Sequence, residues 1–118
     1  MHQDVQEKVF EEIDTIVGSY DGLLDLETLN KLTYLEMVIK EVLRLFPILP
    51  VVARETTAEF EMAGFTIPEG TMLAISPFSV QRNTKYWGND AHEFKPERFE
   101  PDNIKNVDPY AFIPFVSK

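Results

Sequence analysis

The stretch TYLEMVIKEVLRLFP, from Thr33 to Pro47, decides the fold. Its apolar residues recur every three or four positions, which is typical of an amphipathic helix. These residues are Leu35, Val38, Ile39, Val42, Leu45 and Phe46. Thr33 and Glu36 have the spacing of a capping box that would open the helix, and Pro47 is expected to end it because proline lacks an N–H.

Two charged residues, Glu41 and Arg44, stand at the border of that apolar face. Residues three apart on a helix are neighbours, so these two are able to pair. One interpretation is a solvated ion pair of small energetic value. The other is a buried network in which Arg98, from the downstream run PERF, uses the remaining acceptor sites of the Glu41 carboxylate. Spacing alone leaves both interpretations open.

The segment before Thr33 is also expected to be helical. Apolar residues between positions 5 and 17 form a second helical stripe that ends at Gly18, and Asp4 and Glu7 have capping-box spacing at its start. Asp25 is placed to cap a short helix that follows.

The segment after Pro47 changes to a strand pattern. We expect strands at 51–56, 60–62, 65–67 and 72–75, the middle two joined into a hairpin by Ala63-Gly64. Beyond Pro77 the chain is rich in proline, asparagine and large aromatic residues, which favours coil. The predicted fold class is therefore α+β.

Composition excludes several classes of function. The chain of 118 residues has a net charge of −9 and no basic patch, which argues against nucleic acid as a partner. It contains no cysteine, so it holds no disulfide, thiolate ligand or thiolate nucleophile. His2 and His92 lack companion ligands, and no catalytic constellation stands out, so we predict no catalytic residue and no metal site. No stretch is long and apolar enough to span a bilayer.

The order of the motifs carries more information than any one of them. Glu41-Val42-Leu43-Arg44 is followed by Arg54 beyond a proline-rich turn, then by residues 64–71, 86–99 and 110–115. In that order they resemble the carboxy-terminal third of the cytochrome P-450 family, the haem-thiolate monooxygenases. The amino-acid sequence of these motifs is similar to that of the insect branch of the microsomal fatty-acid-hydroxylase-like group. The resemblance covers almost the whole chain.

This resemblance implies a partial cytochrome P-450 fold. The expected parts are helices that follow the oxygen-activating helix, the E-x-x-R helix, a small β-hairpin sheet and a coil-rich stretch before the haem loop. Residues 1–118 would be a single partial domain, truncated before the loop that carries the haem-ligand cysteine. That loop reads F-x-x-G-x-R-x-C-x-G in the family and would begin at Phe115, but Lys118 stands where glycine is expected.

The resemblance also implies roles for individual residues. Glu41, Arg44 and Arg98 would form a structural triad, Arg54 would meet a haem propionate, and Phe115 would lie at the start of the haem loop. For Arg54 the alternative is exposure to solvent or pairing with a nearby glutamate, namely Glu55, Glu59 or Glu61. A hydrophobic substrate pocket would be lined by Ile48, Leu49, Pro50, Val51 and Val52, although ordinary core packing predicts the same residue types.

For the parent protein, the family implies insertion of one oxygen atom of dioxygen into a hydrophobic small molecule. Haem would be the cofactor, a redox partner such as an NADPH-dependent reductase would supply electrons, and the location would be the endoplasmic reticulum membrane, contacted only through parts outside this chain. The fragment alone is expected to be inactive, and nothing in it predicts its own location. The alternative is a non-catalytic interaction module, or a degraded or splice-variant product of such a gene.

Overall fold

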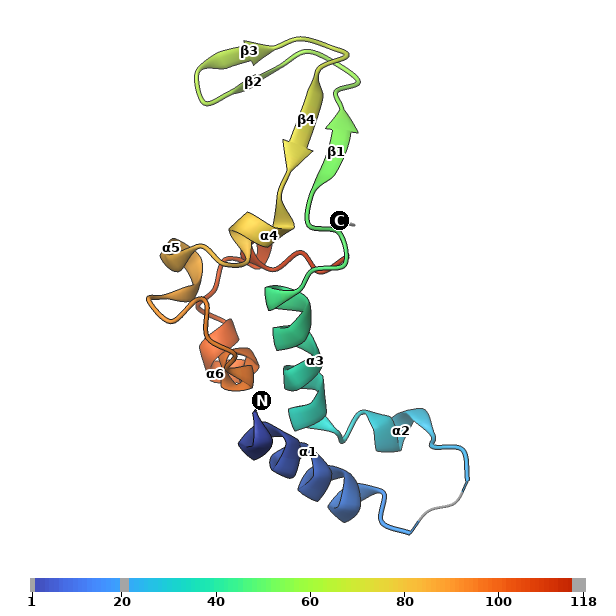
Figure 1. Cartoon of the computed structure of the whole chain (residues 1–118). Helices are drawn as coiled ribbons and strands as arrows, with labels where there is room; N and C mark the ends of the chain where they lie inside the picture. Colours follow the sequence, from blue (N-terminus) through green and yellow to red (C-terminus); the bar gives the residue numbers. More distant parts are fainter. Residues whose placement is uncertain (1, 20–21, 116–118) are drawn as a thin grey trace.

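The computed structural model describes residues 2–19 and 22–115, with helices at one end and two strand pairs at the other (Figure 1). The chain is elongated, measuring 59 × 34 × 25 Å with a radius of gyration of 18.5 Å. A compact domain of similar length has a radius of gyration of about 13 Å. The described residues therefore form an open arrangement around a small core, and the mixed helix and sheet content confirms the α+β class.

Three helices make up the first part of the chain: α1 (Gln3–Ile16), α2 (Leu26–Leu29) and α3 (Thr33–Leu45). The Asp25 side chain caps α2 by accepting the backbone N–H of Thr28 at 2.7 Å, as predicted. The capping box expected at the start of α1 is wrong, because the helix begins at Gln3 and so places Asp4 inside its first turn.

The capping box expected at the start of α3 is also wrong, and the reason is a contact between helices. The residue before α3 is Leu32, and no side chain of the box closes the first turn. Instead the carboxylate of Glu12, on α1, accepts the backbone N–H of Tyr34 at 2.7 Å and that of Leu35 at 2.8 Å. The first N–H groups of a helix have no partner within it, and a negative charge is favoured there, so Glu12 satisfies both requirements.

Two antiparallel strand pairs follow α3. β1 (Val52–Glu55) pairs with β4 (Met72–Ile75), and β2 (Phe60–Met62) pairs with β3 (Phe65–Ile67). Ala63 and Gly64 join β2 to β3 with φ values of 53° and 81°. Positive φ at both central residues is the geometry of the two-residue turn that matches strand twist, so the hairpin forms where the sequence predicts it.

The last part of the chain is a series of single turns joined by coil. They are α4 (Pro77–Val80), α5 (Thr84–Trp87), η1 (Pro96–Phe99), α6 (Pro101–Ile104) and η2 (Pro109–Ala111), where η marks a 3₁₀ helix. Four of the five have proline in the first turn, where its lack of an N–H costs nothing. This stretch folds back against α3, which explains why α3 and η1 lie side by side.

The core lies between α3 and this coil-rich stretch. Trp87, Ala91, Phe99 and Ala111 form its buried centre, and Met37 of α3 packs against it. The Phe99 and Phe112 rings meet edge to face with their centroids 4.9 Å apart, an arrangement favoured by the charge distribution of aromatic rings. The polar network described next lies at the edge of this core.

Candidate functional site

Glu41 and Arg44 form a fully buried ion pair, both side chains having no exposed surface. Arg44 Nε donates to Glu41 Oε2 at 2.6 Å, and Arg44 Nη2 donates to Glu41 Oε1 at 2.8 Å. This is a bidentate contact between a guanidinium and a carboxylate. The burial rules out the solvated surface pair that the spacing alone allowed.

The remaining donors of Arg44 bind backbone carbonyls of the coil-rich stretch. Nη1 donates to the carbonyls of Gln81 and Ala91, each at 2.7 Å, and Nη2 donates to that of Glu93 at 3.1 Å. All five N–H groups of the guanidinium thus have acceptors. The guanidinium also lies 5.0 Å from the centroid of the Trp87 ring. One side chain of α3 therefore fixes three separate points of the stretch that follows β4.

Arg98 lies close to the same carboxylate but makes its hydrogen bonds elsewhere. Its Nε is 3.5 Å from Glu41 Oε1, and this atom has no hydrogen-bond partner among the described residues. Its outer nitrogens donate to the carbonyl of Trp87 at 2.9 Å, to Asp90 Oδ1 at 2.8 Å and to the Asp90 carbonyl. The structure thus brings Glu41, Arg44 and Arg98 together, with Arg98 as the link to Asp90.

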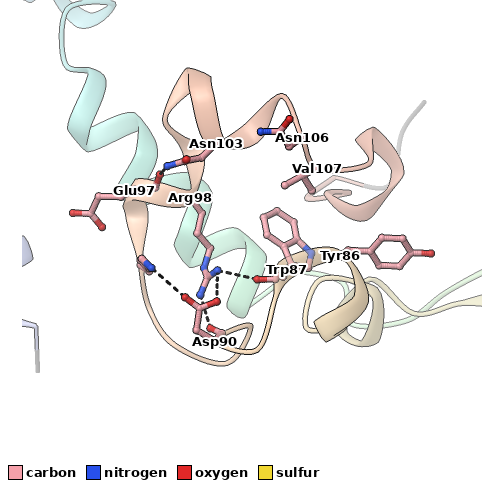
Figure 2. A pocket seen from close by; sticks show the side chains of 9 residues that line it. Tyr86, Trp87, Asp90, Glu97, Arg98, Asn103, Asn106 and Val107 are labelled. Carbon is pink, nitrogen blue, oxygen red and sulfur yellow. Dashed lines mark hydrogen bonds and ion pairs between the residues drawn. The ribbon is translucent and has the colours of Figure 1, made fainter.

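Asp90 is a member of this network that the sequence analysis missed (Figure 2). Hydrogen bonding to Arg98 lowers the pKa of its carboxyl from 3.8 to about 2. Lys95 supports the same charge state, with its Nζ 3.1 Å from Asp90 Oδ2. Asp90 and Arg98 also line an open pocket of about 350 Å³, together with Trp87 and Lys95 of the same network and with neighbours outside it such as Tyr86 and Val107.

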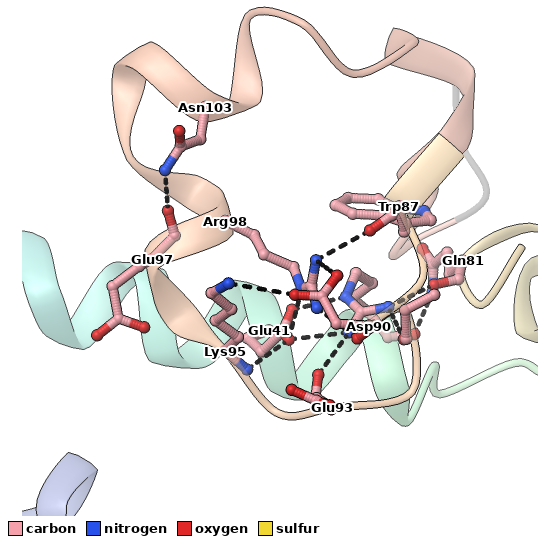
Figure 3. A network of polar contacts seen from close by, with 11 residues as sticks. Glu41, Gln81, Trp87, Asp90, Glu93, Lys95, Glu97, Arg98 and Asn103 are labelled. Carbon is pink, nitrogen blue, oxygen red and sulfur yellow. Dashed lines mark hydrogen bonds and ion pairs between the residues drawn. The ribbon is translucent and has the colours of Figure 1, made fainter. Parts of the chain in front are cut away.

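Gln81 is a second member of the network that the sequence analysis missed (Figure 3). Its side chain is fully buried. Nε2 donates to the carbonyls of Leu43 and Arg44, and Oε1 accepts the backbone N–H of Ile113. A glutamine between Val80 and Arg82 gives no sequence signal for such a role, because its partners lie more than 30 residues away along the chain.

The two residues predicted to contact the cofactor, Arg54 and Phe115, lie on the surface. Arg54 is exposed on β1, where Nη1 donates to the Ala53 carbonyl at 3.1 Å. Within the described residues it makes no ion pair, so the alternative of pairing with a nearby glutamate is not found. Phe115 is 63% exposed.

Four of the five residues predicted to line a substrate pocket lie in the connection from α3 to β1, and the fifth, Val52, is the first residue of β1. Ile48, Leu49 and Val51 are 65%, 51% and 58% exposed, and Pro50 is also exposed. Val52 is the buried member of the set, so core packing accounts for Val52 and leaves the other four without a covering partner in the described part of the chain.

Comparison with known proteins identifies the family. The sequence model of the cytochrome P-450 family matches residues 1–117. The chain belongs to the cytochrome P-450 family. It is 45% identical over 112 residues to cytochrome P-450 4V2 of Homo sapiens, an alignment that covers 95% of this chain and 21% of that protein. It is 41% identical over 116 residues to probable cytochrome P-450 4p3 of Drosophila melanogaster, covering 98% of this chain and 22% of that protein.

The resemblance of the motifs to cytochrome P-450 is therefore confirmed at the level of the family. The chain spans about a fifth of the length of the curated relatives it matches. No helix in the described part of this cytochrome P-450 chain is long and apolar enough to cross a membrane.

Proposed function

We propose that residues 1–118 are the carboxy-terminal part of the catalytic domain of a haem-dependent monooxygenase. The parent would use electrons from an NADPH-dependent reductase to insert one atom of dioxygen into a hydrophobic small molecule. The observation that carries the proposal is the buried contact of Glu41 with Arg44 and Arg98, within a chain that the family model matches over residues 1–117. The resemblance described above implies the endoplasmic reticulum membrane as the location of the parent.

The proposed role of the buried network is architectural. A charge is costly to bury, and the loss of one partner from a buried pair costs about 3–5 kcal/mol because the other charge is left unpaired. Arg44 joins α3 to the carbonyls of Gln81, Ala91 and Glu93. The network thus fixes the coil-rich stretch against α3, and that stretch leads to Phe115.

The exposed arginine and apolar residues are of the chemical types that suit contact with the edge of a haem. Haem is a flat apolar ring with two carboxylates. Arg54 offers an exposed guanidinium with no carboxylate partner in the described residues, and the exposed apolar residues Ile48, Leu49 and Val51 precede it in the sequence. We infer that Arg54 would hold a propionate and that Phe115 would contact the ring. The apolar residues from Ile48 to Val52 would form one wall of the substrate pocket.

The haem itself would supply the oxygen chemistry, and the protein would bind and orient it. The chain has no cysteine, so its residues fit the periphery of the haem and not its axial thiolate. We therefore propose that the chain by itself is inactive. The alternative, a non-catalytic interaction module, rests on its exposed apolar residues, such as Phe10 and Ile39.

The experiment compares the 118-residue chain with the product of the full transcript beyond Phe115. Each protein is mixed with haem, reduced and exposed to carbon monoxide. The full product is expected to give the absorption band of a thiolate-ligated haem, and the chain alone is expected to lack it. A full product that contains no haem, or a transcript that stops at Lys118, would favour the interaction module.

A further inference from the structure

Gln81 is completely buried, and both the NH₂ group and the oxygen of its side-chain amide make hydrogen bonds. Both hydrogens of Nε2 are donated, to the Leu43 carbonyl at 3.1 Å and to the Arg44 carbonyl at 3.0 Å. Oε1 accepts the Ile113 backbone N–H at 2.9 Å. An amide that is satisfied on both sides joins the two segments that it contacts.

The first segment is the carboxy-terminal turn of α3. The Leu43 carbonyl would normally accept the N–H four residues later, but that residue is Pro47, which has none. The Arg44 carbonyl also lacks a partner within the helix, since α3 ends at Leu45. Gln81 supplies both donors from outside the helix and so completes its last turn.

The second segment is the one that leads to Phe115. Phe112 is held on its apolar side by the Trp87 and Phe99 rings, with centroid distances of 6.4 Å and 4.9 Å. The next residue, Ile113, is held by Gln81 through its backbone. These two contacts fix the direction in which the chain leaves the core, two residues before Phe115.

We propose that Gln81 is a positioning residue for the cofactor, because it sets the place of the segment 112–115 relative to the end of α3. This inference rests on the proposed function, in which Phe115 contacts the haem. Residue type supports the assignment, because the position needs two donors and one acceptor without a charge. The buried guanidinium of Arg44 donates to the Gln81 carbonyl, so a second cation would be repelled, and a carboxylate would leave the two carbonyls unpaired.

The test uses the haem-containing parent protein in three forms: wild type, Gln81→Met and Gln81→Glu. Methionine fills a similar volume without these hydrogen bonds, whereas the carboxylate keeps an acceptor for Ile113. Gln6→Met, on the exposed side of α1, is the matched control. The readouts are hydrogen exchange at the Ile113 amide, haem content per protein and the absorption spectrum of the bound haem.

In the wild type, the Ile113 amide is expected to exchange more slowly than the Phe112 amide. Gln81→Met is expected to speed exchange at Ile113 about fivefold or more, the loss expected for one hydrogen bond, and to lower haem content. Gln81→Glu is expected to keep more of the Ile113 protection than Gln81→Met does, and Gln6→Met is expected to change nothing.

Any one of three results would overturn the inference. The first is a wild-type Ile113 amide that exchanges as fast as that of Phe112, a measurement that needs no variant. The second is equal loss of Ile113 protection in Gln81→Met and Gln81→Glu. The third is unchanged haem content and an unchanged spectrum in Gln81→Met. A wild-type parent that binds no haem would contradict the proposed function instead, so the two failures are distinguishable.

Discussion

The carboxylate of Glu12 accepts the backbone N–H of Tyr34 at 2.7 Å, so a residue of α1 completes the first turn of α3. The two residues are 22 positions apart in the sequence. A second contact lies nearby, where Lys8 Nζ is 3.0 Å from Glu97 Oε1 and the Tyr34 hydroxyl donates to the same oxygen at 3.4 Å. These polar contacts join α1 to α3 and to η1.

Removal of the Glu12 carboxylate is expected to destabilise α3 and the docking of α1. Glu12→Ala leaves the N–H groups of Tyr34 and Leu35 without their acceptor, and the loss of such a cap costs about 1 kcal/mol. Thermal unfolding of the parent protein measures the effect. Glu11→Ala, which changes an exposed neighbour on the same helix, is the control. Equal melting temperatures for the two variants would contradict the role of Glu12.

Disruption of the buried pair is expected to be far more harmful. Arg44→Met leaves the Glu41 carboxylate buried beside an apolar side chain, and the expected loss is about 3–5 kcal/mol of unfolding free energy. The matched control is Lys40→Met, which removes the exposed pair between Lys40 and Glu36 and is expected to cost less than about 1 kcal/mol. Denaturant unfolding compares the two. A loss of similar size in both would show that burial of the Glu41 pair has no special cost.

Asp90 is expected to make the structure sensitive to acid. Its pKa is lowered to about 2 in the folded chain, against 3.8 without its partners, and Arg98 is the main cause. A carboxyl whose pKa is depressed on folding contributes stability above pH 3.8, and that contribution is lost as the pH falls towards about 2. Arg98→Met is expected to move the Asp90 pKa back up, as followed by NMR titration of the carboxyl carbon. An Asp90 pKa that does not change in this variant would rule out Arg98 as the cause.

The 118-residue chain expressed alone is expected to be aggregated or loosely folded. Phe10 on α1 is 70% exposed, and Ile39 and Val42 on α3 are also exposed. Since burial is worth about 25 cal/mol per Å² of apolar surface, a few hundred Å² left in water amounts to several kcal/mol, comparable to the stability of a small domain. Size-exclusion chromatography and thermal unfolding test this. A monodisperse monomer with a sharp transition would contradict the prediction and favour an independent interaction module.

Periodicity predicted the regular elements well because it reflects local geometry. The helix that ends before Pro47 and the hairpin around Ala63-Gly64 both lie where the sequence pattern places them. The spacing of Glu41 and Arg44 also predicted their contact, since residues three apart on a helix are neighbours.

The partners that come from distant segments were not predictable in this way. Pro47 shows from sequence alone that the Leu43 carbonyl lacks its usual donor, but nothing local indicates that Gln81 provides one. In the same way, the capping box of Thr33 and Glu36 is a local solution, and it is displaced by Glu12 once α1 packs on α3. Asp90 was missed because its importance depends on Arg98, eight positions later and on no shared helix.

Because Glu12 completes one end of α3 and Gln81 completes the other, the length of this helix is set by residues outside it. Deleting one residue between Thr33 and Leu45 would rotate one end relative to the other by about 100°. The buried face that carries Glu41 and Arg44 would then lose its alignment with at least one of the two ends. Substitutions at the exposed residues of α3 are therefore expected to be tolerated better than a change in the number of its residues.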